Sequence, residues 1–303
     1  MMKVPIPTFE RMRAALMGWY RQRARELRFR GTRDPWAILV SEVMAQQTQV
    51  ARVELAWVGF MERFPTPEVL SEAPTAEVLQ AWAGLGYNRR AVHLQRAARS
   101  IMDRHAGSVP SELTELEALP GVGPYTARAV AAIAFGRPVG AVDTNVRRVV
   151  ARLTGVPGAS VRDVQAQADA LADPRDPAAW THALMDLGAS VCRAREPACA
   201  ECPLRPWCLT APLVLAGGAL AVARPKAPAS NLRATRFVDT SRWLRGRIVA
   251  HLRELEPGEW AHLPSALGDH GWEAIGIALQ ALQRDGLVER HADGGVRLPS
   301  RPA

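Results

Sequence analysis

The residues with the clearest chemistry are four cysteines in the second half of the chain. Cys192, Cys199, Cys202 and Cys208 are the only cysteines among the 303 residues, and their spacing is C-x6-C-x2-C-x5-C. A disulfide framework would spread cysteines along the chain, so this clustering favours metal binding. Thiolates suit both zinc and iron–sulfur clusters. Zinc ribbons usually offer two close C-x-x-C pairs, and this chain has one.

A second candidate site is the turn 120–124, PGVGP, between two apolar helical stretches. Glycine tolerates positive φ, so Gly121 and Gly123 let the chain fold back sharply. Pro124 opens the second helix, where its missing N–H costs nothing. The backbone N–H groups of Val122 and Gly123 would then lie bare beside a helix N-terminus of partial positive charge. The turn is therefore predicted to bind a phosphate.

Two carboxylates, Glu42 and Asp143, are candidates for catalysis. Glu42 falls on a predicted helix beside Gln46 and Gln47, and Asp143 ends an apolar stretch. Two carboxylates can serve together as a general acid and as a fixed electrostatic stabiliser of positive charge. On spacing alone, two ordinary interpretations are favoured, a solvated glutamate and the N-cap of helix 144–153.

The composition indicates a polyanionic partner. The net charge is +8 and the sequence pI is about 10.1. Residues 1–30 are too charged for a secretory signal, and the longest apolar run, 211–223, is too short to cross a bilayer. We expect a cytoplasmic, nucleoid-associated protein that is a monomer and has no membrane partner.

The elements that must position these groups are helices. Apolar periodicity and Pro and Gly breaks predict a region that is almost wholly helical to about residue 210. The predicted helices are 8–29, 35–49, 50–63, 67–71, 75–83, 88–105, 161–172 and 177–191.

The last hundred residues change character. Residues 211–239 are rich in Gly, Ala, Pro and Arg, so they are predicted to form a linker. Helices are predicted at 241–254, 261–267 and 271–285, followed by a β-hairpin around Asp293-Gly294. Three helices and a hairpin are typical of a winged helix, which can bind DNA or serve as a packing or protein-contact module.

The run 113–150 resembles the helix-hairpin-helix element and trailing aspartate of the base-excision DNA glycosylases, a family that includes endonuclease III and the adenine DNA glycosylases. The resemblance implies a mainly α fold of two domains. These are a six-helix domain at 34–145, which contains the hairpin, and an iron–sulfur cluster domain formed by 1–33 and 146–210. The linker 211–239 and a winged-helix-like module at 240–303 follow.

The resemblance also implies catalytic roles. Residues 41–50, SEVMAQQTQV, and 141–148, AVDTNVRR, are similar to the catalytic segments of the adenine-specific members. It assigns protonation of the purine to Glu42, and stabilisation of the sugar to Asp143 with support from Asn145. Tyr125 stands where bifunctional relatives carry a Schiff-base lysine. Because Lys3 and Lys226, the only lysines, lie far from this motif, we expect a monofunctional enzyme.

The cysteine spacing, with Pro203 after the third cysteine, resembles the [4Fe–4S] loop of this family. The implied partner is double-stranded DNA with a mismatched or damaged base pair. Gln47, Leu85 and Tyr87 would fill the gap left by an extruded base. Contacts to DNA are also expected from Gly121, Val122, Gly123, Arg193 and Arg195.

The base that is removed is less firmly indicated than the reaction. Phe29, Ala45 and Thr144 depart from the residues usual in adenine-specific members, so the pocket has room for another base. We expect removal of adenine mispaired with guanine or 8-oxoguanine. The alternatives are a mismatch glycosylase of the same fold for thymine or uracil and a non-catalytic DNA-binding protein.

Overall fold

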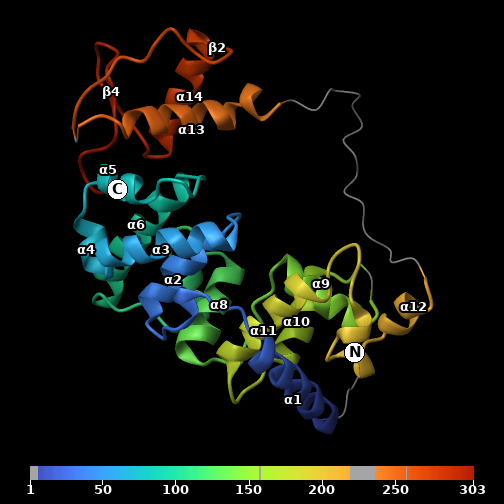
Figure 1. Ribbon diagram of the computed structural model, residues 1–303. Helices are drawn as coiled ribbons and strands as arrows, with labels where there is room; N and C mark the ends of the chain where they lie inside the picture. The colour runs from blue at the N-terminus through green and yellow to red at the C-terminus, as the bar shows by residue number, and fades with distance from the viewer. Residues whose placement is uncertain (1–5, 157, 219–235, 257) are drawn as a thin grey trace. The chain divides into compact units, whose positions relative to one another are not determined.

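The computed structural model describes residues 6–156, 158–218, 236–256 and 258–303, and these are mainly helical (Figure 1). The α-helices are α1 (Ile6–Arg23), α2 (Pro35–Ala45), α3 (Val50–Arg63), α4 (Pro67–Glu72), α5 (Thr75–Ala81), α6 (Arg89–His105), α7 (Leu113–Glu117), α8 (Pro124–Phe135), α9 (Thr144–Leu153), α10 (Val161–Leu171), α11 (Pro177–Ser190), α12 (Ala211–Leu215), α13 (Ser241–Leu252) and α14 (Trp272–Arg284). Short 3₁₀ helices are η1 (Arg28–Arg30), η2 (Cys199–Glu201), η3 (Arg205–Trp207) and η4 (Phe237–Asp239). The strands are β1 (Ala266–Leu267), β2 (His270–Gly271), β3 (Glu289–Arg290) and β4 (Val296–Arg297).

The chain divides into two compact units, each built from several segments. The first contains residues 1–38, 111–113 and 123–228, and the second contains 39–110, 114–122 and 229–303. Residues 219–235 of the predicted linker lie outside the described residues, and α12 occupies its first part. The domain boundaries given above remain a prediction.

The first unit packs α1, α8, α9, α10 and α11 around a core of leucine, valine and alanine. Leu16 of α1, Val150 of α9 and Trp180 of α11 are at most 1 % exposed in that core. The predicted helix 8–29 ends early, at Arg23. The reason is tertiary, because Arg25 and Arg30 turn back to bind the buried Asp186 of α11.

The second unit begins with the helices α2 to α6. Phe60, Phe64 and Trp82 are fully buried. The centre of the Phe60 ring lies 4.9 Å from that of Phe64 and 5.8 Å from that of Trp82. α6 is strongly amphipathic, and its buried face packs against α4 and α5. These helices determine the position of the turn 82–88, which follows α5.

The C-terminal part of the second unit, residues 237–303, is named here the C-terminal module. It contains α13, α14 and two small antiparallel sheets, β1–β2 and β3–β4. The predicted helix 261–267 is wrong. Ala261 pairs with Val296 in an isolated bridge, and Ala266–Leu267 form a strand. Pro264 explains the difference, because it lacks an N–H and disfavours helical backbone in the residue before it.

Within the described residues, no helix combines the length and apolarity needed to cross a membrane.

Candidate active site and cysteine cavity

Asp143 is the N-cap of α9 in the first unit. Its Oδ1 accepts a hydrogen bond from Val146 N at 2.6 Å, and its Oδ2 accepts one from Asn145 Nδ2 at 3.1 Å. Asp143 therefore does have the N-cap role that the ordinary interpretation gave it. It also fixes the half-buried carboxylate in one orientation, which a catalytic carboxylate requires.

A chain of hydrogen bonds joins Asp143 to the cysteine loop. Arg148 Nη2 donates to Asn145 Oδ1 at 2.8 Å and to Gly188 O at 2.7 Å, and its Nε donates to Cys192 O at 2.7 Å. A side chain at Gly188 could not fit, since its Cβ would lie 2.7 Å from the Cβ of Asn145. The site prediction did not include Arg148. Its spacing three residues after Asn145 on a helix was the available signal.

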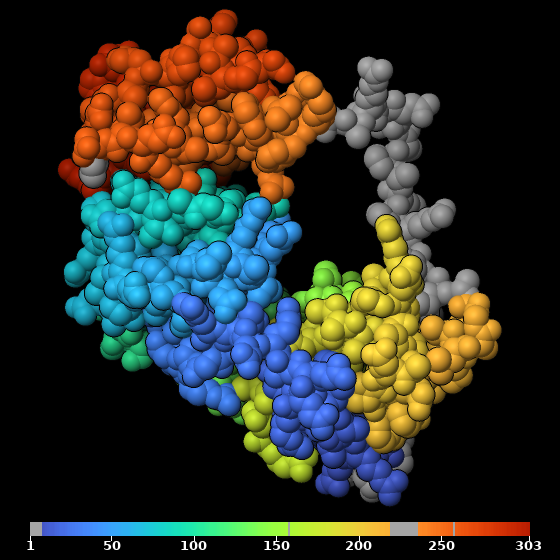
Figure 2. Space-filling view, viewed as in Figure 1, coloured from blue at the N-terminus to red at the C-terminus, as the bar shows by residue number. Residues whose placement is uncertain are grey.

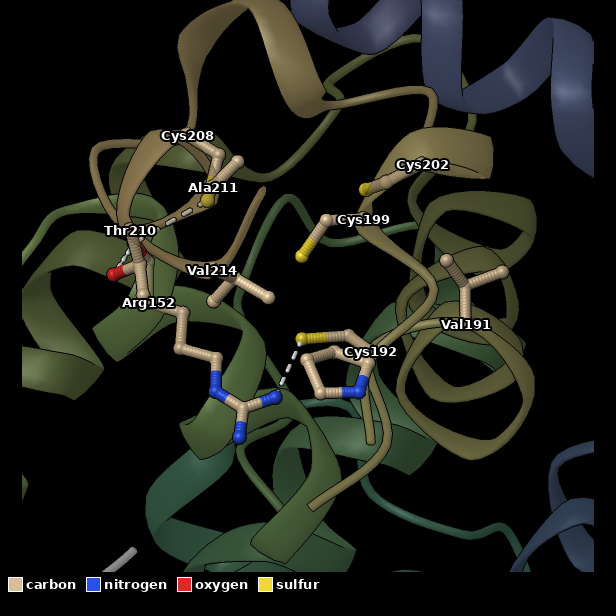
Figure 3. A pocket seen from close by; sticks show the side chains of 10 residues that line it. Arg152, Val191, Cys192, Cys199, Cys202, Cys208, Thr210, Ala211 and Val214 are labelled. Carbon is tan, nitrogen blue, oxygen red and sulfur yellow. Dashed lines mark hydrogen bonds between the residues drawn. The ribbon is translucent and has the colours of Figure 1, made fainter. Parts of the chain in front are cut away.

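The four cysteines surround one cavity, shown in Figure 3. Apart from Arg152 and Thr210, the rest of its lining is apolar. The lining residues besides the cysteines are Arg152, Val191, Pro197, Thr210, Ala211 and Val214. The thiols come from the segment after α11, from η2 and from the turns that flank η3. All four are free cysteines. The four predicted ligands thus line the same cavity, and their role in binding a metal centre stays a prediction.

The surroundings of the cavity suit bound thiolates. Burial raises the pKa of the Cys199 and Cys208 thiols, and it raises the pKa of Cys202 to about 11. Such thiols ionise readily only when a cation balances the charge. Arg152 Nη1 lies 3.5 Å from Cys192 Sγ and donates to Arg193 O at 2.7 Å, and Arg152 Nη2 donates to Ala194 O at 2.7 Å.

The possible metal ligands in the lining of this cavity are the four cysteine thiols. Among the residues that the structure describes, no three Cys, His, Asp or Glu side chains converge as one ion would require. The sulfur atoms are instead distributed around an open space (Figure 3). A set of four cysteines around a cavity, with no carboxylate or imidazole in the lining, matches the chemistry of an iron–sulfur cluster.

Tyr125 lies in the first turn of α8, and its hydroxyl is 3.9 Å from Met185 Sδ. The chain's only lysines, Lys3 and Lys226, lie outside the described residues. Gly123 is the N-cap of α8, with φ −95° and ψ 177°. Arg193 and Arg195 are exposed on the cysteine loop, and Arg193 Nε donates to Glu196 O at 3.0 Å.

Glu42 lies on α2 in the second unit and is 8 % exposed. It is therefore not the solvated helix glutamate of the ordinary interpretation. Gln46 and Gln47 follow it at the end of α2, and Gln46 Nε2 donates to Gly121 O at 3.3 Å. This contact joins the segment after Glu42 to the turn that precedes α8.

Arg90 is the main organiser of this region, and the sequence did not mark it. Its guanidinium donates to carbonyls of the segment 43–46 at the end of α2, to Thr48 Oγ1 and to the carbonyls of Leu85 and Gly86. Burial lowers the pKa of Arg90 to about 10, so the group stays charged at neutral pH. It holds the end of α2 and the turn 82–88 together.

The two residues expected to enter the DNA stack have unusual backbone conformations. Gln47 has φ 57° and Tyr87 has φ 46°, and they are two of three non-glycine residues with positive φ in the described chain. Both side chains are exposed. Strain of this kind persists only where the surroundings hold it, and it gathers at functional sites. Leu85 differs, because its side chain is 4 % exposed.

The turn before α8 is tighter than the sequence indicated. Gly121 has φ 80°, and a Cβ there would lie 2.7 Å from the Cβ of His93. Val122 N donates to Leu119 O at 3.1 Å, so this N–H is not bare as expected. The prediction that it contacts a phosphate would require it to leave that partner.

Comparisons with known proteins agree with this geometry. Residues 40–174 match the model of the HhH-GPD superfamily of base excision DNA repair proteins. An adenine DNA glycosylase of Mycobacterium tuberculosis is 42% identical over 294 residues, which cover 94% of this chain and 92% of that protein.

Two further relatives connect the chain to the wider superfamily. A thymine-DNA glycosylase of Aeropyrum pernix is 35% identical over 66% of this chain and 94% of its own length. The structure of a non-covalent endonuclease III–DNA complex aligns with a TM-score of 0.58 and 28% identity, over 69% of this chain and 98% of that one. The predicted mainly helical fold class is confirmed. The chain belongs to the adenine DNA glycosylase family within the HhH-GPD superfamily.

Proposed function

We propose that the protein is a monofunctional DNA glycosylase of base excision repair that hydrolyses the N-glycosidic bond of adenine mispaired with guanine or 8-oxoguanine. Its family membership supports the reaction class. The observation that carries the proposal furthest is the Asp143 carboxylate, held by Val146 N and Asn145 at the start of α9.

The two carboxylates have different tasks. Glu42, which is mostly shielded from water, delivers a proton to the departing purine ring. Asp143 stabilises the oxocarbenium-like sugar that the departing base leaves behind. Asn145 is the positioning residue for Asp143, and Arg148 in turn positions Asn145. Because a tyrosine cannot form a Schiff base, Tyr125 supports hydrolysis without strand cleavage.

The four cysteines, Cys192, Cys199, Cys202 and Cys208, would hold a [4Fe–4S] cluster. When bound, it supplies iron–thiolate bonds that stabilise the loop between α11 and α12. The protein's own contribution is the contact of Arg152 with the 193–194 carbonyls and that of Arg148 with Cys192 O. These contacts link the loop to α9, which begins at Asp143. They also hold the loop that presents Arg193 and Arg195 to DNA.

The substrate is double-stranded DNA with a mismatched or damaged base pair, bound by a monomer where chromosomal DNA lies, in the cytoplasm. Gln47 and Tyr87, with Leu85, fill the gap that the extruded base leaves in the stack. Gly123 and the turn before it contact a phosphate. The proposed domains are 34–145, then 1–33 with 146–210, and 240–303 after the linker.

A second candidate is removal of thymine from a mismatch. The similarity to the Aeropyrum pernix thymine-DNA glycosylase favours it. Glu42 argues against it, because protonation of a ring nitrogen in the leaving base is a need of purines.

A panel of duplexes decides between these activities. Purified protein is incubated with duplexes that contain A opposite 8-oxoguanine, A opposite G, A opposite T, T opposite G or U opposite G. We expect base release from the first two duplexes, seen as strand breaks only after alkali. Release of thymine or uracil alone would support the second candidate. Strand breaks without alkali would contradict the monofunctional mechanism.

A further inference from the structure

The C-terminal module is built onto the helices that carry the turn 82–88. The backbone N–H groups of Thr75 and Ala76, at the start of α5, donate to Arg301 O at 3.2 Å and to Pro299 O at 2.9 Å. Such N–H groups have no partner within their own helix. Thr75 Oγ1 also donates to Arg301 O at 2.9 Å. Figures 1 and 2 show the chain end beside α5.

The module also contacts the other end of this segment, where α6 begins. Arg253 Nη2 donates to Asn88 Oδ1 at 2.9 Å. Asp285, at the end of α14, pairs with Arg89 at 3.6 Å and with Arg245 of α13. Residues 75–89 are therefore held at both ends by the module. The turn that contains Tyr87 lies between these two attachments.

The Tyr87 ring has two arginines close to it. The guanidinium carbon of Arg242, on α13, is 4.0 Å from the centre of the Tyr87 ring. That of Arg90 is 5.4 Å from the same centre. Arg242 also lies 5.6 Å from the ring centre of Phe237. Tyr87 is still 38% exposed, so the contacts orient the ring without burying it.

We propose that Arg242 of the C-terminal module is a positioning residue that holds the Tyr87 ring ready to enter the DNA stack. This inference rests on the proposed function, in which Tyr87 fills the gap left by the extruded base. The module thus acts on base removal through the turn 82–88, whether or not it touches DNA itself.

The chemistry of the pair supports a positioning role. A guanidinium is planar and stacks on an aromatic face, where it fixes the ring plane. Tyr87 needs such support, because its backbone has the left-handed conformation that side-chain-bearing residues adopt reluctantly. Arg90 donates to backbone carbonyls of two segments, and these hydrogen bonds fix the position of its guanidinium. Arg242, in contrast to Arg90, is exposed.

The test measures the single-turnover rate of adenine release from a duplex with A opposite 8-oxoguanine, with enzyme in excess. Arg242→Gln should lower the rate about two- to fivefold, the size of an exposed cation–π contact. Arg242→Lys keeps the charge but not the planar stack, so its rate should lie between those of the original protein and Arg242→Gln. The matched control is Arg247→Gln, another exposed arginine of α13, which should match the original protein.

Two further measurements separate positioning from DNA binding. With 2-aminopurine beside the 8-oxoguanine, the fluorescence increase on binding should be smaller for Arg242→Gln. The slope of log K against log salt should not change, whereas loss of a phosphate contact would lower it by about 0.9. In a Tyr87→Ala background, Arg242→Gln should have no further effect on the rate.

The proposal is overturned if Arg242→Gln releases adenine at the original rate, if the salt slope falls, or if Arg247→Gln slows release equally. It is also overturned if the two substitutions, Arg242→Gln and Tyr87→Ala, are additive. Failure of the unsubstituted protein to release adenine from any duplex would instead contradict the proposed function. Thermal unfolding of each variant checks that the fold is retained.

Discussion

Asp143 combines a structural role with a proposed catalytic role in one carboxylate. One oxygen caps α9, and the other accepts from Asn145. An asparagine caps a helix about as well as an aspartate does, but it carries no charge. The two roles can therefore be separated by one substitution.

We predict that Asp143→Asn leaves the unfolding midpoint nearly unchanged and slows adenine release about 10²–10³-fold, the loss typical of a fixed electrostatic stabiliser. Single-turnover kinetics and thermal unfolding measure the two effects. Asp176→Asn is the matched control, because Asp176 caps α11 by accepting from Ala179 N at 3.1 Å. A fully active Asp143→Asn variant would remove this residue from the mechanism.

Glu42 is the proposed acid that protonates the departing purine. We predict that Glu42→Gln keeps its affinity for the mismatched duplex and loses about 10²–10⁴-fold in the rate of base release, because the amide cannot donate the proton. Duplex binding and single-turnover release are measured in parallel. Glu62→Gln, on the exposed side of α3, should behave like the original protein. Undiminished release by Glu42→Gln would assign the acid to another group.

At the scale of elements, helix ends decide much of the arrangement. α5 begins after a proline and has no side-chain cap, and the last residues of the chain supply carbonyl partners instead. α9 and α11 begin at aspartates that cap them. Arg90 serves the end of α2 in the same way, by binding its last carbonyls. The cap of α9 and the end of α2 thus lie within a few residues of Asp143, Gln46 and Gln47.

Removal of residues 299–303 should expose the first N–H groups of α5. We predict a loss of about 1–2 kcal/mol in the free energy of unfolding, as for loss of a helix cap. Urea titration followed by circular dichroism measures it. Arg301→Ala is the control, because only the backbone carbonyl of Arg301 is used and its side chain is exposed. Equal stability of the shortened chain would show that water replaces the carbonyls without cost.

The contact between α1 and α11 should make stability depend on pH. Desolvation, with a further contribution from the charge of Arg30, lowers the pKa of His182 to about 3, although Asp186 opposes the shift. Folded His182 therefore stays neutral where the unfolded chain, with a histidine pKa near 6.5, takes up a proton. Stability is then lost as the pH falls below about 6.5, by at most about 1.4 kcal/mol per pH unit.

His182→Gln should lose less stability than the original protein between pH 7 and pH 5. Urea titrations at several pH values measure the difference. The window stays above the range where Asp186 titrates. The hydrogen bonds and charges of Arg30 and Arg25 outweigh the effect of burial and lower the pKa of Asp186. His262→Gln, at an exposed position, should follow the original curve. Parallel curves for His182→Gln would contradict a neutral buried histidine.

At the scale of the whole molecule, the chain carries +8 in charge and a cysteine cavity that suits a cluster. We predict that the purified protein is brown and contains iron and acid-labile sulfide in equal amounts. Cys202→Ser should lose both, and Glu201→Gln, exposed in the same loop, should keep both. A colourless protein with bound zinc would refute the cluster.

Several features of this protein could be identified from local sequence alone. The turn 120–124, the segments around Glu42 and Asp143 and the cysteine spacing are short motifs, and their chemistry depends on neighbours within a few residues. Most helix boundaries also agreed to within one or two residues, because apolar period and caps are local signals.

Tertiary structure decided the rest. Arg90, Arg148 and Arg242 look like ordinary surface arginines in the sequence, and each acquires its role from partners 40 or more residues away. The end of α1 has the same origin, since Asp186 binds the arginines that follow it, whereas the missing helix at 261–267 follows from Pro264. Motifs indicate which residues do the chemistry, whereas packing determines which residues hold them in place, because those contacts exist only once the chain is folded.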